Sequence, residues 1–260
     1  MKTNFYKLTF WVLVFGFSFS NISFSAIHTV RGNGDLITSE RAVSAFQEIS
    51  SSGSAEVRFF SSDEQRVVVT VDSNLYEFVE ISTRNNVLNI GTKSGNYNFT
   101  KFLVEIHSPT LTNVTMSGSG KFIGMDKIIT PNFRAILSGS GRIEGTFECN
   151  NFSARVSGSG RVEATVKSNG LSATISGSGR ITTRGTSEDT DITVSGSGNF
   201  SGNNFSTVGA TITVRGSGSA NICVEESLNA RISGSGNLNY FGNPATVNAK
   251  VTGSGRVRQM

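Results

Sequence analysis

Residues 156–162 read Val-Ser-Gly-Ser-Gly-Arg-Val, and variants of this stretch recur through the C-terminal half of the chain. The triplet Gly-Ser-Gly occurs eight times, at intervals of 18 to 21 residues. The first glycines are Gly118, Gly139, Gly158, Gly177, Gly196, Gly216, Gly234 and Gly253, and the second are Gly120, Gly141, Gly160, Gly179, Gly198, Gly218, Gly236 and Gly255. A period of this length is typical of a solenoid in which each repeat forms one coil.

Apolar and polar residues alternate on both sides of each triplet. Before Gly158 the apolar residues are Phe152, Ala154 and Val156, and the first apolar residue after the triplet is Val162. Strict alternation indicates a strand with one buried face. The same parity places both glycines of each triplet on the buried face, where a missing β-carbon permits a tight corner. The sequence therefore predicts an all-β fold, a parallel β-solenoid of about eight coils of about 19 residues each.

The region before the first triplet is less regular. Ser52-Gly53-Ser54-Ala55 looks like a degenerate first copy of the triplet. Four more strands are expected at residues 67–71, 75–81, 87–90 and 102–106, separated by turns at 72–74, 84–86 and 94–96. We expect this irregular region to form a β cap over one end of the stack, since an exposed coil edge invites aggregation.

The first 26 residues have the pattern of a secretory signal peptide. Lys2 and Lys7 precede an apolar run from Leu8 to Phe19, and small residues follow up to Ala26. The run is shorter than the about 20 residues that a membrane span needs, and no second apolar run follows it. We therefore expect an exported chain without a transmembrane segment, in the periplasm, on the outer surface or outside the cell.

The organisation that we predict has one domain after the signal peptide. Residues 27–45 form a leader segment, and residues 46–258 form a single solenoid domain. Within that domain, residues 46–116 supply atypical N-terminal coils and the cap, and residues 117–258 supply the Gly-Ser-Gly repeats.

Charge and cysteine content limit the possible functions. The formal net charge of +4 falls to +2 when Lys2 and Lys7 are removed with the signal peptide, which is too small an excess for a nucleic-acid-binding surface. Cys149 and Cys223 are the only cysteines, and they fall four coils apart. A separation of about 19 Å along the stack rules out a disulfide between them. Both are predicted to be free, and no cofactor or metal site is expected.

The chain offers few groups for catalysis. His28 and His107 are the only histidines, and they lie far apart in the sequence. Glu144 and Glu163 occupy equivalent outward positions on adjacent coils, about 5 Å apart, a spacing that fits a retaining glycosidase but also a surface charge ladder with Arg142 and Arg161. A carbohydrate-active enzyme, a glycosidase or a lyase, therefore remains the alternative to a non-enzymatic binding or structural protein.

One row of side chains is a candidate binding site. The residue after each of the first four triplets is basic, namely Lys121, Arg142, Arg161 and Arg180. In register, these four side chains stack in a row beside columns of serine hydroxyls. Such a strip can engage an anionic surface polysaccharide or an envelope protein. It can equally shield a solvated sheet, with Glu144 and Glu163 relieving the repulsion. The oligomeric state is not predicted.

The chain also resembles a known family. The run from Phe46 through Ile49 and Gly53 to Val57, the strand before Asp72, and the repeated Ser-Gly-Ser-Gly-Arg are similar to the head GIN domain of autotransporter adhesins. The resemblance covers about residues 46–258. It implies a right-handed parallel β-helix, a bacterial source and a place in the cell envelope or outside the cell. It supplies no catalytic residues.

Overall fold

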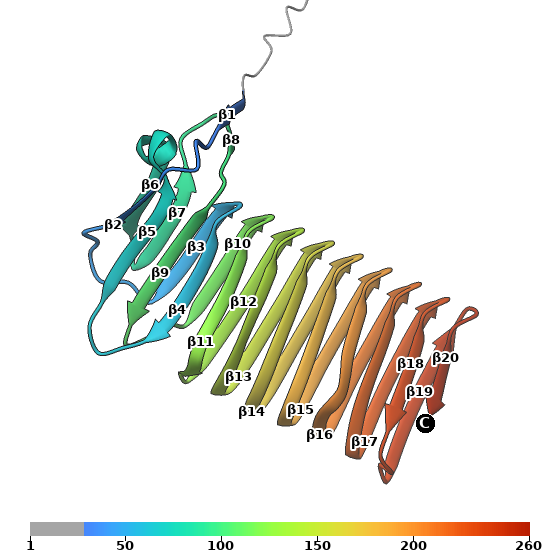
Figure 1. Cartoon of the computed structure of the whole chain (residues 1–260). Helices are drawn as coiled ribbons and strands as arrows, with labels where there is room; N and C mark the ends of the chain where they lie inside the picture. Colours follow the sequence, from blue (N-terminus) through green and yellow to red (C-terminus); the bar gives the residue numbers. More distant parts are fainter. Residues whose placement is uncertain (1–28) are drawn as a thin grey trace, which may run out of the picture.

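The computed structural model describes residues 29–260, so the predicted signal peptide lies outside the described residues. The described chain is an elongated rod of stacked β-coils with a broader β-structure at its N-terminal end (Figure 1). One short 3-10 helix, η1 (Ser73–Phe78), interrupts the strands. Within residues 29–260, no helix has the length and apolar character needed to cross a membrane.

The strands follow the chain in this order: β1 (Thr29–Arg31), β2 (Leu36–Glu40), β3 (Glu48–Gly53), β4 (Glu56–Ser61), β5 (Arg66–Asp72), β6 (Val79–Arg84), β7 (Val87–Thr92), β8 (Asn96–Asn98), β9 (Phe102–Ser108), β10 (Asn113–Gly118), β11 (Lys121–Ile129), β12 (Asn132–Gly139), β13 (Arg142–Gly158), β14 (Arg161–Gly177), β15 (Arg180–Gly196), β16 (Asn199–Gly216), β17 (Ser219–Gly234), β18 (Asn237–Phe241), β19 (Thr246–Thr252) and β20 (Arg256–Gln259).

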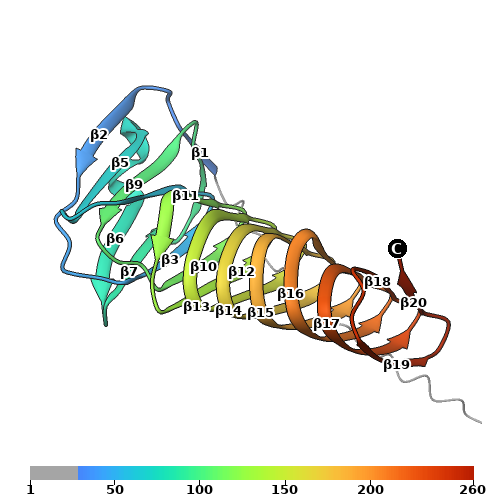
Figure 2. The same cartoon turned by 90° about the horizontal axis from the view of Figure 1, so that it is seen from below.

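Each long strand from β13 to β17 makes one coil, and each coil pairs in parallel with the next. The triplets lie directly above one another, since Gly139 pairs with Gly158, and Gly158 with Gly177. Figure 2 shows the coils as hoops one behind another. The predicted β-solenoid of about eight coils is therefore confirmed.

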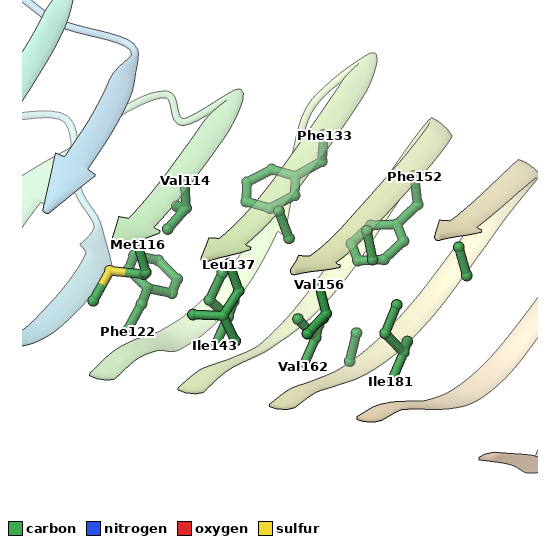
Figure 3. Close-up of a cluster of buried hydrophobic side chains, with 14 of the residues drawn as sticks. Val114, Met116, Phe122, Phe133, Leu137, Ile143, Phe152, Val156, Val162 and Ile181 are labelled. Carbon is green, nitrogen blue, oxygen red and sulfur yellow. The ribbon is translucent and has the colours of Figure 1, made fainter. Parts of the chain in front are cut away.

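Every coil has two sheet segments joined at the triplet. We call the segment before the triplet the pre-triplet sheet and the segment after it the post-triplet sheet. In β13, for example, Asn151 to Ser157 belong to the first and Arg142 to Cys149 to the second. The inward side chains of the two sheets meet in the interior, as Leu137 and Ile143, and then Val156 and Val162, do in Figure 3.

The two glycines of a triplet have different roles. The first glycine has a φ between +101° and +114° in all eight copies, a region that side-chain-bearing residues rarely adopt. The second glycine is buried in the seven copies from Gly120 to Gly236. Our expectation that both glycines face inward is wrong for the first one, which is exposed at Gly158. The positive φ turns the chain outward there, so Ser157, Gly158 and Ser159 are all exposed.

The core is a set of columns that run along the rod. Aromatic rings fill it near the cap, where Phe147 lies with its ring centroid 4.3 Å from that of Phe133 and 5.0 Å from that of Phe152. The Phe152 column continues through Leu171, Thr190, Ala210 and Leu228, and the solvent-exposed fraction of each residue is 4% or less. Burial of this mostly apolar interior is the main force that stabilises the stack.

The N-terminal region forms the predicted cap, but not in chain order. The degenerate copy is a true coil, since Gly53 pairs with Gly118 and has a φ of +91°. Strands β7 and β9 pair in parallel with β3 and β4 and so add a layer beyond this coil. Strands β6 and β5 then pair antiparallel with β7 and β9, and β2 pairs antiparallel with β5. The switch to antiparallel pairing ends the parallel stack (Figure 1).

Two segments of the cap can be compared with the strand and the turn that the sequence predicts there. The strand expected at residues 75–81 is wrong in its first half, because residues 73–78 form η1 and β6 begins only at Val79. Leu75 is fully buried, so its apolar side chain signals core packing rather than a strand. The expected turn at residues 84–86 is confirmed. Asn85 and Asn86 have φ values of +49° and +66°, and they join β6 and β7 as a two-residue hairpin loop.

A buried carboxylate ties the cap together. Asp72 has no solvent exposure, and it accepts hydrogen bonds from the backbone N–H groups of Gly34 and Thr100 at 2.9 and 2.8 Å. The hydroxyl of Thr100 also donates to it. Burial works against the charged form, but these hydrogen bonds outweigh it and lower the pKa of Asp72. Asp72 thereby joins the end of β5 to the chain before β2 and before β9.

Candidate functional site

The predicted basic row exists on the outer face of the post-triplet sheet. Lys121 pairs with Arg142, Arg142 with Arg161, and Arg161 with Arg180, each in the adjacent coil. Four cationic side chains therefore line up at successive coil spacings of about 4.8 Å. The next residue in register is the uncharged Asn199, so the row of cations ends at Arg180.

The four cations differ in their partners. Arg142 donates a hydrogen bond to Glu144 at 2.8 Å, and Lys121 lies 3.6 Å from the same carboxylate. The hydrogen bond to Glu144 raises the pKa of Arg142, with burial opposing it. Among the described residues, Arg161 and Arg180 form no ion pair, and both are exposed. Arg161 and Arg180 are therefore the cations of the row that have no ion-pair partner among the described residues, with the Glu163 carboxylate two residues after Arg161 on the same outer face.

Glu144 and Glu163, the two carboxylates that a glycosidase would use, lie in register. Glu144 pairs with Glu163 on adjacent coils, as expected. Glu144 forms ion pairs with Arg142 and Lys121 on the flat outer face of the sheet. This arrangement has the form of a charge ladder, in which carboxylates offset neighbouring cations.

His107 does not lie beside these glutamates. His107 lies in β9 of the cap, with its ring stacked on Phe60 at a centroid distance of 4.7 Å and an interplanar angle of 9°. His28 lies outside the described residues. Within residues 29–260, no three His, Cys, Asp or Glu side chains gather as metal ligands.

A shallow groove follows the corner of the coils opposite the triplets, and sequence reasoning missed it. Its volume is about 760 Å³, and it crosses the coils from β11 to β17. Its lining includes the charged side chains of Glu148, Lys167, Glu188 and Glu225. Lys127 donates a hydrogen bond to Glu148 at 2.9 Å, and together with Lys167 it lowers the pKa of that carboxyl.

The floor of this groove is polar because the inward column beneath it is polar. Cys149, Ser168, Ser187 and Thr207 succeed one another in register at a corner position. The Ser187 hydroxyl donates to the carbonyl oxygens of Asn169 and Asp189, whereas the buried Ser168 hydroxyl has no partner among the described residues. Three hydroxyl residues at one position of successive repeats are the signal that could have predicted this column.

Both cysteines are free: Cys149 lies in β13 and Cys223 in β17. Burial raises the pKa of the Cys149 thiol to about 11, while a backbone hydrogen bond from Phe133 works in the other direction. A thiol with so high a pKa is a poor nucleophile at neutral pH.

Stacked coils of about 19 residues with a glycine corner in each define a β-solenoid scaffold. The chain belongs to the family described as putative auto-transporter adhesin, head GIN domain, which it matches over residues 45–244.

Solved structures of the same fold are bacterial. A putative lipid binding protein from Parabacteroides distasonis is 26% identical, with a TM-score of 0.86 over 90% of this chain and 100% of that one. A putative adhesin from Parabacteroides merdae is 28% identical, with a TM-score of 0.85 over 89% of this chain and 99% of that one. A second putative adhesin from Parabacteroides distasonis is 26% identical, with a TM-score of 0.84 over 90% of this chain and 100% of that one. The comparison with curated proteins found no match.

Proposed function

We propose that the chain is an exported, non-enzymatic surface protein, and that the post-triplet face of residues 46–258 binds an acidic polysaccharide through the basic row. The family is described as putative auto-transporter adhesin, head GIN domain, and two similar structures are named putative adhesins, which supports a binding role. The signal-peptide pattern of residues 1–26 supports export to the periplasm, the outer surface or the exterior.

One observation carries this proposal. Arg161 and Arg180 stand one coil apart on the same face, exposed and without an ion-pair partner among the described residues. A guanidinium binds a carboxylate or sulfate with two parallel hydrogen bonds, so regularly spaced arginines suit a polymer with regularly spaced anions. Serine and threonine hydroxyls at Ser159, Ser178 and Thr182 surround them and can bond to sugar hydroxyls.

The test measures binding of residues 27–260 to immobilised polygalacturonate, with neutral dextran as the reference polymer. We expect binding to polygalacturonate alone, weakening as salt rises from 50 to 500 mM by screening, on the order of tenfold or more. The double variant Arg161→Ala/Arg180→Ala should weaken binding by about tenfold. The matched control is Arg155→Ala, an exposed arginine of the preceding coil, β13, that lies on the pre-triplet sheet, and it should leave binding unchanged.

Other outcomes would contradict the proposal. Binding that is equal for dextran, or that Arg155→Ala weakens as much as the double variant, would remove the row as the site. Because one similar structure is named a putative lipid binding protein, vesicles of phosphatidylglycerol serve as a further arm. Retention on the vesicles but not on polygalacturonate would assign the row to a lipid surface instead.

The alternative function, a carbohydrate-active enzyme, is tested by a separate assay. Release of reducing ends from the polysaccharide, abolished by Glu144→Gln or Glu163→Gln, would establish a glycosidase. We expect no release, because Glu144 is held between two cations on a flat face.

A further inference from the structure

The last coil of the rod presents an uncovered apolar surface. All seven residues of β19 are exposed, and Val247 and Val251 each have an exposed fraction of 40%. One coil earlier the same columns hold Leu228 and Ile232, with exposed fractions of 0% and 1%. The difference arises because the following coil covers Leu228 and Ile232, whereas no described residue covers β19.

The backbone of this coil is unpaired on the same side. Among the described residues, β19 pairs only with β17, and β20 only with β18. The outer edges of both strands therefore offer N–H and C=O groups that can pair with another strand. At the other end of the rod, antiparallel strands β2, β5 and β6 complete the cap (Figure 1).

The sequence of β19 is self-complementary. Residues 246–252 read Thr-Val-Asn-Ala-Lys-Val-Thr, which is nearly the same in both directions about Ala249. Two antiparallel copies centred on Ala249 would place Val247 opposite Val251 and Ala249 opposite Ala249 on the inner face. On the outer face Lys250 would oppose Asn248, so two lysines would not meet.

We propose that this end of the rod is a contact surface for a second copy of the same chain. A two-fold axis perpendicular to the rod passes midway between the Ala249 residues of the two copies. This axis relates the last coil of one copy to the last coil of the other, so the strands of the two coils run in opposite directions. The two β19 strands then pair antiparallel, and the two rods join end to end. The same surface serves both copies, so the assembly closes at a dimer. This contact is independent of the basic row.

The area that the two copies would bury sets the expected affinity of the dimer. Seven strand residues span about 23 Å, and two sheets with their outer side chains span about 20 Å. The contact would bury on the order of 900 Å² from both copies, which is at the low end for specific interfaces. The dimer should therefore form reversibly, with a fraction that rises with protein concentration.

Sedimentation velocity of residues 27–260 at concentrations up to about 1 mM tests for this dimer. The unchanged chain should pass from monomer to dimer over that range. Ala249→Asp would bring two carboxylates together at the axis and should lower the association constant more than tenfold. The control Asn248→Asp places its carboxylate opposite Lys250 of the other copy and should keep the dimer. Circular dichroism confirms that each variant retains its β-structure.

A cysteine pair tests the register directly. Ala249→Cys should form a disulfide-linked dimer under mild oxidation, because both cysteines lie at the axis within reach of each other. Thr252→Cys, on the same strand and also exposed, would lie about 20 Å from its counterpart and should stay monomeric on a non-reducing gel. A chain that remains monomeric at every concentration, a dimer insensitive to Ala249→Asp, or equal cross-linking of the two cysteine variants would overturn the proposal.

Discussion

A β-carbon at Gly160 would lie 2.7 Å from the carbonyl oxygen of Gly141, its counterpart in the neighbouring coil. The same atom would lie 2.7 Å from a methyl carbon of Leu137. Stacked triplets therefore approach closely, and the second glycine is required for space rather than for an unusual φ. The first glycine, at Gly158, is required both for its φ of +110° and for space, because a β-carbon there would lie 2.7 Å from the carbonyl oxygen of Gly139.

We expect Gly160→Ala to destabilise the solenoid by about 1–3 kcal/mol, because the backbone carbonyl that it meets cannot move without shifting a coil. Gly158→Ala should cost about 1–3 kcal/mol through backbone strain. The control is Ser159→Ala, an exposed residue between the two glycines, which should change stability by less than about 0.5 kcal/mol. Urea unfolding followed by circular dichroism measures all three. A glycine variant as stable as Ser159→Ala would refute the packing argument.

The buried carboxylate of Asp72 predicts a pH dependence of stability. Its pKa in the folded chain is below the ordinary value of 3.8 because four hydrogen-bond donors outweigh the burial cost. The Asp72 carboxylate therefore binds a proton more readily in the unfolded chain than in the folded chain. The contribution of Asp72 to stability is complete above pH 3.8 and is lost as the pH falls through the lowered pKa.

Asp72→Asn provides the comparison. At pH 7 we expect it to be less stable than the unchanged chain, since an amide cannot accept all of these hydrogen bonds. The difference should narrow as the pH falls below 3.8, which thermal unfolding between pH 2 and 7 would show. A difference that is constant over this range would mean that Asp72 is not ionised in the folded chain.

Ser168 and Ser187 occupy the same position in adjacent coils but differ in hydrogen bonding. The Ser168 hydroxyl is buried without a partner, so we expect Ser168→Ala to stabilise the chain by about 1 kcal/mol. Ser187→Ala should destabilise it by about 1 kcal/mol, because the Ser187 hydroxyl donates to two carbonyl oxygens. Chemical unfolding of the pair compares them directly. Equal losses in both variants would indicate that Ser168 also has a partner, such as a bound water.

The raised pKa of Cys149 predicts slow alkylation at neutral pH. In a Cys223→Ser chain, the rate of alkylation at Cys149 should rise with pH to a midpoint near pH 11. Iodoacetamide should react at pH 8 far more slowly than with an unfolded sample of the same chain, since only the thiolate is nucleophilic. A midpoint near the ordinary thiol value of 9.0 would contradict the burial of this side chain.

Much of the architecture follows from local pattern. The spacing of Gly158 and Gly177 predicts the coil length, and the alternation around Val156 predicts which side chains fill the core. The register of Lys121, Arg142, Arg161 and Arg180 then follows, because equivalent positions of stacked coils must lie above one another. The residues before Gly118 carry no such period. Local pattern therefore predicts a strand at the buried Leu75, which lies in a 3-10 helix.

Local sequence is sufficient to predict the solenoid, because the identity of each glycine and the alternation of each strand act on neighbouring residues of the same coil. Only the folded chain shows which cations of the row have no ion-pair partner within residues 29–260, how β7 and β9 insert beyond the first coil, and that no residue in this range covers the inner face of β19. These features depend on contacts between side chains and strands that are distant along the chain, and a local pattern carries no record of such contacts.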